Sequence, residues 1–260
     1  MVNEKILLLI GAFIFGSIIG SFLNVLIYRL PRGLTPFKPT FSFCPNCRTQ
    51  IKYYDNIPII SYLFLKGKCR NCKSPISLRY PIVEALTGFA SILAYLKAGL
   101  SIDYVFTFLF LALMITLSFI DFDFKIIPDE INFFGFILGL IYTFFRDDYS
   151  LFDGIIGAGI GGGFLFTIAY FYEKFKGIEG LGMGDVKLMI FIGSYIGWFG
   201  ALFTIFLGSI LGTIIALAGA LASNIEDKGK YEIPFGPYLA IAGSIYLLIG
   251  DKIRAFYFGG

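Results

Sequence analysis

Long apolar runs separated by short polar connections make up most of this chain. The first run extends from Ile6 to Leu30, and comparable runs follow from residue 80 onward. About 20 consecutive apolar residues span the hydrocarbon core of a bilayer, so these runs predict transmembrane helices. We place them near residues 6–28, 80–98, 103–120, 130–146, 151–172, 185–199, 200–222 and 235–250. The predicted fold class is an all-α polytopic membrane protein with about eight transmembrane helices.

The first apolar run is expected to remain in the protein as a transmembrane helix. It is too long for the apolar region of a secretory signal and lacks a small-residue cleavage site. The composition agrees with a membrane protein, because 57% of the 260 residues are hydrophobic, 15% are charged and the mean hydropathy is +0.79.

The absence of histidine restricts the chemistry that this protein can perform. The sequence has no histidine, which excludes Ser-His-Asp and Cys-His catalysis and every imidazole metal ligand. Acid–base chemistry therefore falls to carboxylates, lysine, tyrosine or cysteine.

The only long polar segment, residues 31–79, separates the first two predicted spans. It carries nine lysines and arginines against a single acid, Asp55. Cytoplasmic loops of membrane proteins are enriched in basic residues, so we expect this loop to be cytoplasmic and the N-terminus to lie outside. The predicted division is a first span (1–30), a cytoplasmic loop (31–79) and a transmembrane core (80–260).

Counting spans from this loop places the unusual residues at one membrane face. The connections after the first, third, fifth and seventh spans would all be cytoplasmic. They hold four cysteines, then Asp121 and its neighbours, then a glycine-rich stretch before Asp185, then residues Ser223 to Pro237. The other connections, around Lys97–Asp103, Arg146–Ser150 and Trp198–Gly200, carry nothing distinctive.

The four cysteines form two Cys-x-x-Cys pairs separated by 21 residues: CPNC at 44–47 and CRNC at 69–72. Two such pairs are typical of a structural zinc site, in which four thiolates bind Zn²⁺ tetrahedrally. The predicted ligands are Cys44, Cys47, Cys69 and Cys72. With all four positions used, no position is left for a catalytic water. Two disulfides and a redox dithiol are the alternatives, although a reducing cytoplasm disfavours disulfides.

The glycines of GAGIGGG (157–163) lie inside a predicted span at small-xxx-small spacing. The pairs are Gly157 with Gly161 and Gly159 with Gly163. Close packing of helices is the expected role. A phosphate-binding loop is not expected, because no strand precedes these residues.

Two aspartates are predicted to meet at the cytoplasmic edge of the bilayer. Asp121 ends the third span and Asp185 begins the sixth. Acids inside membrane spans are costly and usually functional. Two carboxylates in a poorly solvated site share one proton, as in aspartic proteases, where one activates water and the other polarises the scissile carbonyl. The residues alone fit a proton or ion site of a transporter nearly as well.

Neighbouring residues have both functional and structural interpretations. Gly182 and Gly184 would let a peptide backbone approach Asp185 and allow local unwinding. Lys187 has four candidate roles. The functional ones are to stabilise developing charge or to bind an acidic residue of the substrate; the structural ones are to pair with Asp185 or to anchor the helix at the cytoplasmic face. Asp129 follows Pro128 and precedes an apolar run, so its expected role is to cap the fourth span.

Six segments resemble the type IV prepilin peptidase family in the same order along the chain. They are GSFLNVLIYRLP (20–31), the paired-cysteine loop, SLRYPIVEALTG (77–88), IDFDFKIIPDEIN (120–132), GMGDVKLM (182–189) and IPFGPYLAIAG (233–243). The resemblance places the two catalytic aspartates of these membrane proteases on Asp121 and Asp185. GxGD alone would be weak, because other membrane proteases share it.

The resemblance also implies substrates, a cofactor and a location. It implies cleavage of a basic leader, after a glycine, from type IV prepilins or pseudopilins at the cytoplasmic face of the inner membrane. Many members also methylate the new N-terminus with S-adenosylmethionine, and the cysteine loop is typical of those forms, so we predict both activities. The methyl-donor site is unknown; Asn24, Arg79 and Glu84 are only guesses for it. Membrane lipid is an expected partner and nucleic acid is not.

Overall fold

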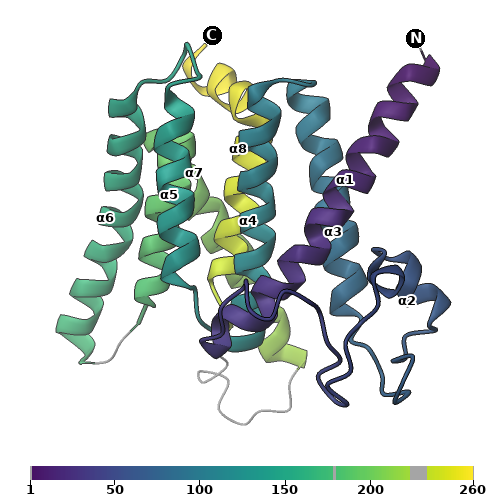
Figure 1. Ribbon diagram of the computed structural model, residues 1–260. Coiled ribbons are helices and arrows are strands. Elements are labelled where there is room, and N and C mark those ends of the chain that lie inside the picture. Colours follow the sequence, from purple (N-terminus) through teal and green to yellow (C-terminus); the bar gives the residue numbers. More distant parts are fainter. Residues whose placement is uncertain (1, 178–179, 223–232, 260) are drawn as a thin grey trace. The chain divides into compact units, whose positions relative to one another are not determined.

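The computed structural model describes residues 2–177, 180–222 and 233–259, and helices dominate this part of the chain (Figure 1). The chain divides into two compact units, Met1–Thr116 and Leu117–Gly260. The boundary falls inside helix α4 (Ile102–Phe124), so one continuous helix contributes to both units. The functional division predicted above, with a separate loop at residues 31–79, stays a prediction.

In the first unit, α1 (Val2–Arg29) packs against α3 (Arg79–Ala98). The two helices approach closely because Gly16 has no side chain: a Cβ atom there would lie 2.6 Å from the Cβ of Ser91. The connection between them contains short helical elements that the sequence analysis did not predict. It contains η1 (Leu30–Arg32), η2 (Tyr53–Asn56) and the short helix α2 (Ile60–Phe64).

The second unit is formed by the end of α4 and by four further helices. These are α5 (Asp129–Thr143), α6 (Leu151–Lys176), α7 (Met183–Ala222) and α8 (Gly236–Phe258). Helices α5, α6 and α8 all pack against α7, which is therefore central to this unit. Residues 223–232 of the predicted Ser223–Pro237 connection lie outside the described residues.

Helix α7 turns back on itself at Gly197. The backbone of Gly197 has φ 74° and ψ −179°, which is not helical. A Cβ atom at Gly243 would lie 3.0 Å from Ile192 and 3.6 Å from Thr204. These two residues would be about 18 Å apart in a straight helix, so both can reach Gly243 only if the chain reverses between them. The two halves of α7 therefore correspond to the separately predicted spans 185–199 and 200–222.

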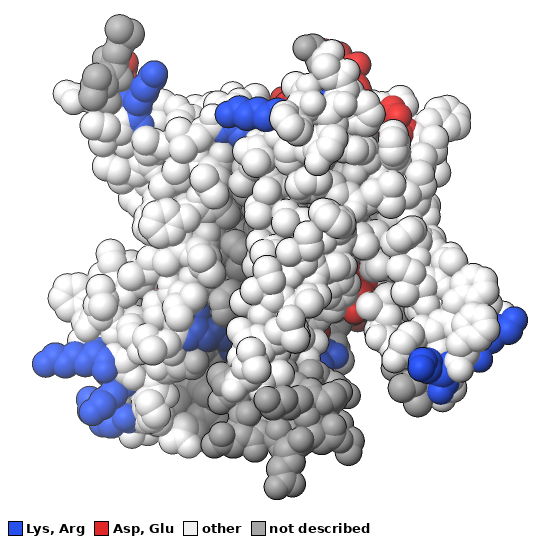
Figure 2. Space-filling model, turned by 180° about the vertical axis from the view of Figure 1, so that it is seen from behind, with Lys and Arg blue, Asp and Glu red and all other residues white. Residues whose placement is uncertain are grey.

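The helices match the predicted membrane protein. Each predicted span coincides with a helix or with half of α7. Among the described residues, five helices are long and apolar enough to cross a membrane, counting α7 once. On the face shown in Figure 2, charged side chains gather toward the two ends of the helices and largely uncharged surface lies between them.

The small residues of α6 pack against α7 at only some of the predicted positions. A Cβ atom at Gly157 would lie 2.6 Å from Gly197 Cα and would also overlap the carbonyl oxygen of Gly193. Gly161 similarly faces the backbone of Met189. The packing role is thus confirmed for this pair. It is wrong for Gly159 and Gly163, which have no such neighbours within 4 Å because they lie on the opposite side of the helix.

Replacing Gly157 by alanine should destabilise the second unit. The added methyl group has no space between α6 and the turn of α7, and overpacking of this kind costs about 1–3 kcal/mol. Gly159→Ala is the matched control, because its methyl group would meet open space. Thermal unfolding in detergent should show a lower midpoint for Gly157→Ala only; equal midpoints would contradict the close packing.

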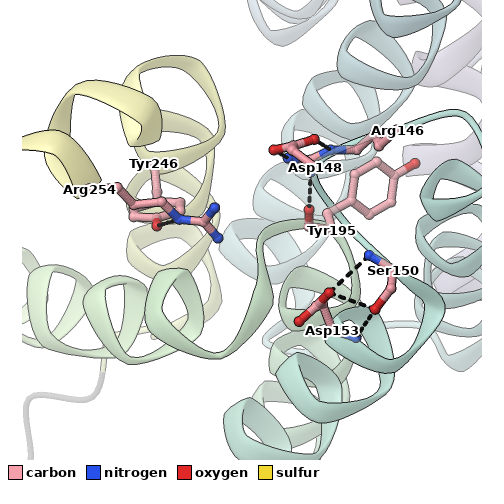
Figure 3. A network of polar contacts seen from close by, with 7 residues as sticks. All are labelled: Arg146, Asp148, Ser150, Asp153, Tyr195, Tyr246 and Arg254. Carbon is pink, nitrogen blue, oxygen red and sulfur yellow. Dashed lines mark hydrogen bonds and ion pairs between the residues drawn. The ribbon is translucent and has the colours of Figure 1, made fainter. Parts of the chain in front are cut away.

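The connection between α5 and α6 contains a polar network that the sequence analysis missed (Figure 3). The Arg146 guanidinium forms an ion pair with Asp148 at 2.9 Å and donates a hydrogen bond to the carbonyl oxygen of Tyr195 at 3.2 Å. Ser150 and Asp153 form a capping box at the start of α6. This network ties the connection to the turn of α7, so the Arg146–Ser150 segment has a structural role.

Candidate active site and metal centre

Asp121 lies in the last turn of α4 and its side chain is buried, with 5% of the residue exposed. The backbone N–H of Gly236, at the start of α8, donates a hydrogen bond to Asp121 Oδ2 at 3.1 Å. The first N–H groups of a helix have no partner within the helix, so they are available to such an acceptor. Directly after the end of α4, the Lys125 N–H donates a hydrogen bond of 2.8 Å to the Asp121 carbonyl oxygen.

Asp185 lies in the first turn of α7 and is 8% exposed. Its backbone N–H donates to the carbonyl oxygen of Gly182 at 3.1 Å, so the helix begins directly after this glycine. A Cβ atom at Gly182 would lie 3.5 Å from Asp185 Oδ2. The two predicted site-shaping glycines have different surroundings, because Gly184 faces Ile127 rather than the carboxylate.

The structure brings Asp121 and Asp185 into one site within the second unit. Ile127 packs against a neighbour of each acid: a Cβ atom at Gly184, next to Asp185, would be 3.1 Å from Ile127 Cβ, and one at Gly236, which bonds to Asp121, would be 2.9 Å from Ile127 Cδ1. The two carboxylates are also close enough to interact electrostatically. The site therefore combines two buried acids, Asp121 of α4 and Asp185 of α7, with the Gly236 N–H at the start of α8. Their catalytic role stays a prediction.

Lys187 pairs with Asp129 at this end of the unit. Its ammonium group lies 2.7 Å and 2.8 Å from the two carboxylate oxygens of Asp129. The prediction that Asp129 caps α5 was wrong: the N-cap residue is Pro128, and no side-chain capping bond is present there. Instead of capping α5, the Asp129 carboxylate accepts hydrogen bonds from the Lys187 ammonium group of α7. The ion pair joins the start of α5 to the start of α7, next to Asp185.

Gly236 is the site residue for which sequence reasoning found no definite role. Pro234, Gly236 and Pro237 interrupt the last predicted span, and the sequence alone does not distinguish a site-shaping role for them from the end of a loop. The structure shows that a Cβ atom at this position would lie 2.7 Å from Asp121 Oδ2. Only a glycine lets the start of α8 come this close to the carboxylate.

The four cysteines of the first unit converge on one point. Their Sγ atoms all lie within 4.8 Å of one another, and the Sγ atoms of Cys44 and Cys72 are 3.9 Å apart. Tetrahedral coordination with metal–sulfur bonds of about 2.3 Å requires sulfur atoms about 3.8 Å apart, so the cluster can hold a metal ion. All four cysteines are free, which favours a ligand set over disulfides.

Each pair of cysteines lies in the same local fold. The N–H of Cys44 donates to Thr49 O and that of Cys69 to Ser74 O, at 3.0 Å and 2.8 Å. The residue after each pair adopts a left-handed conformation, with φ 58° at Arg48 and 60° at Lys73. The two knuckles are therefore structural repeats, each presenting two thiols to the shared point.

The surroundings of Cys47 and Cys72 favour the deprotonated form that binds metals. Hydrogen bonds with the side chain and the backbone of Thr49, and with Asn71, lower the pKa of Cys47 to about 5. Hydrogen bonds with the side chain and the backbone of Ser74 lower the pKa of Cys72. At Cys69, backbone hydrogen bonds from Cys72 and Asn71 lower the pKa, but burial and the neighbouring thiols of Cys44 and Cys72 outweigh them and raise it. Thiolates are the metal-binding form of cysteine.

Comparisons with known proteins identify the family to which both units are similar. The family model for the bacterial peptidase A24 N-terminal domain matches residues 14–98, and that for the type IV leader peptidase family matches residues 108–217. A protein from Aeromonas hydrophila named prepilin leader peptidase/N-methyltransferase is 35% identical over 94% of this chain and 92% of its own length. A protein of the same name from Pseudomonas aeruginosa is 36% identical over 93% of this chain and 90% of its own length.

A comparison with solved structures finds no match. The sequence similarity nevertheless extends over both units, including the cysteine cluster of the first and the paired aspartates of the second. This chain belongs to the type IV leader peptidase family.

Proposed function

We propose that this chain is an aspartyl endopeptidase of the inner membrane that removes the basic leader from type IV prepilins or pseudopilins and then methylates the new N-terminus. The observation that carries the proposal is the burial of Asp121 and Asp185 together in the second unit, in a chain of this family. The relatives' names support both activities.

Hydrolysis would proceed through the two carboxylates acting as a pair. One is protonated and donates a hydrogen bond to the scissile carbonyl, while the other accepts a proton from the attacking water. The tetrahedral intermediate then collapses as the leaving amine receives a proton from the pair. The Gly236 N–H holds Asp121 in a fixed orientation for these steps.

The membrane would position the substrate. The nine lysines and arginines of residues 31–79 support a cytoplasmic location for this loop. The same orientation brings Asp121 and Asp185 to the cytoplasmic edge, where a prepilin has its boundary between basic leader and apolar helix. The glycine before the cut helps the substrate to unwind and enter the site. Membrane lipid surrounds the enzyme, and the proposed activities require no nucleic acid.

The metal of the cysteine cluster is proposed to be structural zinc. Purified protein should contain about one zinc ion per chain, because four thiolates complete a tetrahedral site. Cys44→Ser should lose the metal, as measured by metal analysis, whereas Ser61→Ala, a substitution elsewhere in the loop, should keep it. A chain that retains zinc after loss of Cys44 would contradict the four-thiolate site.

A proton- or ion-coupled transporter that uses Asp121 and Asp185 is the alternative from a different class. It predicts ion-dependent flux in liposomes and no peptide hydrolysis. The two acids lie at the beginning and the end of helices rather than near the middle of a span, and the names of the relatives give this alternative no support.

The proposed function is tested by incubating the purified enzyme with a synthetic prepilin and S-adenosylmethionine. Methylation transfers the methyl group of the donor to the new amino group, leaving S-adenosylhomocysteine and a released proton. Product mass reports both reactions: cleavage removes the mass of the leader, and methylation adds one methyl group. An uncleaved substrate under conditions in which the enzyme is folded would refute the peptidase assignment.

A further inference from the structure

The second unit contains a cavity of about 340 Å³, within the range of ligand-binding pockets. The connection between α5 and α6, the turn of α7 at Gly197 and the last turns of α8 enclose it. Arg254 of this cavity follows Gly236, the contact of Asp121, by 18 positions along α8, a rise of about 27 Å. The hydrocarbon core of a bilayer is about 30 Å thick, so the cavity and the aspartates lie near opposite faces of the membrane.

Charges of both signs face this cavity. Arg254 projects from α8, and its Nε atom donates a hydrogen bond to the Tyr246 hydroxyl at 3.1 Å. Figure 3 shows the other two nitrogens of its guanidinium directed toward Asp148 and Asp153. The three groups are close enough to interact electrostatically, yet in the described part of the chain no ion pair joins Arg254 to either acid. The space between them therefore has a positive and a negative side.

The Tyr149 hydroxyl is a buried polar group without a partner at the same cavity. The residue is 5% exposed, and its hydroxyl forms no hydrogen bond with any of the described residues. It lies against the turn of α7, since a Cβ atom at Gly197 would be 2.8 Å from this oxygen. The Arg146 guanidinium covers the ring, 4.5 Å from its centre, and is itself paired with Asp148. A buried hydroxyl without a partner is unusual in a folded protein and indicates that a bound molecule supplies one.

The two acids keep acceptor capacity for a cation. Ser150 bonds only to Oδ2 of Asp153, through its N–H at 2.9 Å and its hydroxyl at 2.6 Å, so Oδ1 can accept a hydrogen bond from a ligand. Each oxygen of Asp148 accepts one hydrogen bond from Arg146 and can accept another. The two acids and the two arginines, Arg146 and Arg254, have formal charges that cancel. A ligand that carries both charges and no net charge therefore fits better than an anion.

Aromatic and apolar side chains place the cavity at the level of the lipid head groups. Trp198, the only tryptophan of the sequence, and Phe258 both line the cavity and are exposed. Tryptophan is enriched at the boundary between hydrocarbon and head groups. Phe152 and Ile156 are exposed on the first turns of α6, the helix that contributes Asp153, so acyl chains can lie beside the cavity. A small soluble ligand would make no use of this apolar surface.

We infer that this cavity binds the head group of a zwitterionic phospholipid, phosphatidylethanolamine. The phosphate lies against Arg254 and accepts a hydrogen bond from the Tyr149 hydroxyl, and the ammonium group donates to Asp148 and Asp153. Phosphatidylcholine lacks the N–H donors that the carboxylates require, and phosphatidylglycerol lacks the cation. The bound lipid joins the end of α8 to the start of α6 and the turn of α7, and so stabilises the second unit at the face opposite the aspartates.

The test is lipid retention by the purified full-length protein, released from vesicles with equal amounts of phosphatidylethanolamine and phosphatidylglycerol and measured by native mass spectrometry. The unaltered protein should carry mainly phosphatidylethanolamine. Arg254→Gln should lower its retention about tenfold or more, because a charged donor to the phosphate is lost. Tyr149→Phe should lower it as well. In detergent without lipid, Tyr149→Phe should unfold at or above the temperature of the unaltered protein, since it removes only an unbonded hydroxyl.

The matched controls are Lys252→Gln, which removes a positive charge from an exposed position of α8, and Tyr257→Phe, which removes an exposed hydroxyl from the same helix. Both should retain lipid as the unaltered protein does. Equal retention of the two lipids by the unaltered protein, or retention by Arg254→Gln and Tyr149→Phe that equals their controls, would overturn the inference.

Thermal unfolding distinguishes a lipid from a soluble phosphate ester. Short-chain phosphatidylethanolamine should raise the unfolding midpoint of the unaltered protein more than glycerophosphoethanolamine, which has the same head group without acyl chains. An equal rise with both compounds would overturn the lipid assignment in favour of a soluble ligand.

Discussion

Replacing Asp121 or Asp185 by asparagine should lower prepilin cleavage by about 10⁴-fold, the scale on which loss of one member of a catalytic unit acts in other proteases. Asparagine has nearly the same shape as aspartate but can neither accept a proton from water nor share one with a neighbouring carboxylate. Cleavage of a synthetic prepilin by the purified variants, followed by mass spectrometry, measures the effect.

Two controls separate chemistry from folding in this experiment. Asp251→Asn removes an exposed carboxylate from α8 and should leave cleavage unchanged. A synthetic peptide that begins at the mature N-terminus should still be methylated by both Asp121→Asn and Asp185→Asn, because this substrate needs no cleavage by the two carboxylates. Retained cleavage in either variant would remove that aspartate from the catalytic pair.

Replacing Gly236 by alanine should reduce cleavage about 100-fold, since displacement of a catalytic group by about 1 Å has effects of this size. The new methyl group would lie 2.7 Å from Asp121 Oδ2 and 2.9 Å from Ile127 Cδ1. The start of α8 must therefore move away, and the hydrogen bond from the Gly236 N–H to Asp121 must lengthen or break.

Gly159→Ala is the matched control for this substitution, because nothing lies within 4 Å of the position that its methyl group would occupy. Cleavage rate and thermal unfolding should be measured on both variants. A loss of cleavage in Gly236→Ala with a nearly unchanged midpoint would assign the effect to the geometry of Asp121. Full activity of Gly236→Ala would show that the peptidase does not require this contact.

The positions of the helices were predictable because membrane spans have a minimum length and must satisfy their own backbone hydrogen bonds. The division of residues 185–222 into two spans was also predictable, because α7 consists of two halves separated by the non-helical Gly197. The ordered elements between residues 30 and 64 were not predicted, because that loop is polar and has no clear periodicity. Its fold depends instead on the cysteine knuckles and on Arg29, whose buried guanidinium donates hydrogen bonds to the carbonyl oxygens of Thr35, Pro36, Pro39 and Phe41.

The cysteine cluster was predictable from spacing, since two Cys-x-x-Cys pairs leave few other uses for four thiols. The capping role of Asp129 was wrong, because the sequence does not reveal that Lys187 lies opposite it. The different surroundings of Gly182 and Gly184, and the contact between Gly236 and Asp121, also depend on how α4, α7 and α8 pack.

The sequence by itself determined the all-helical membrane fold, the four cysteines that cluster and the two acids that meet. Hydropathy, ligand type and spacing are properties of short segments, so they can be read along the chain. Only the tertiary structure decided that the two acids share a site bounded by Ile127 and Gly236, and that Lys187 pairs with Asp129. Those arrangements are contacts between residues far apart in the chain, and they exist only after the helices have packed.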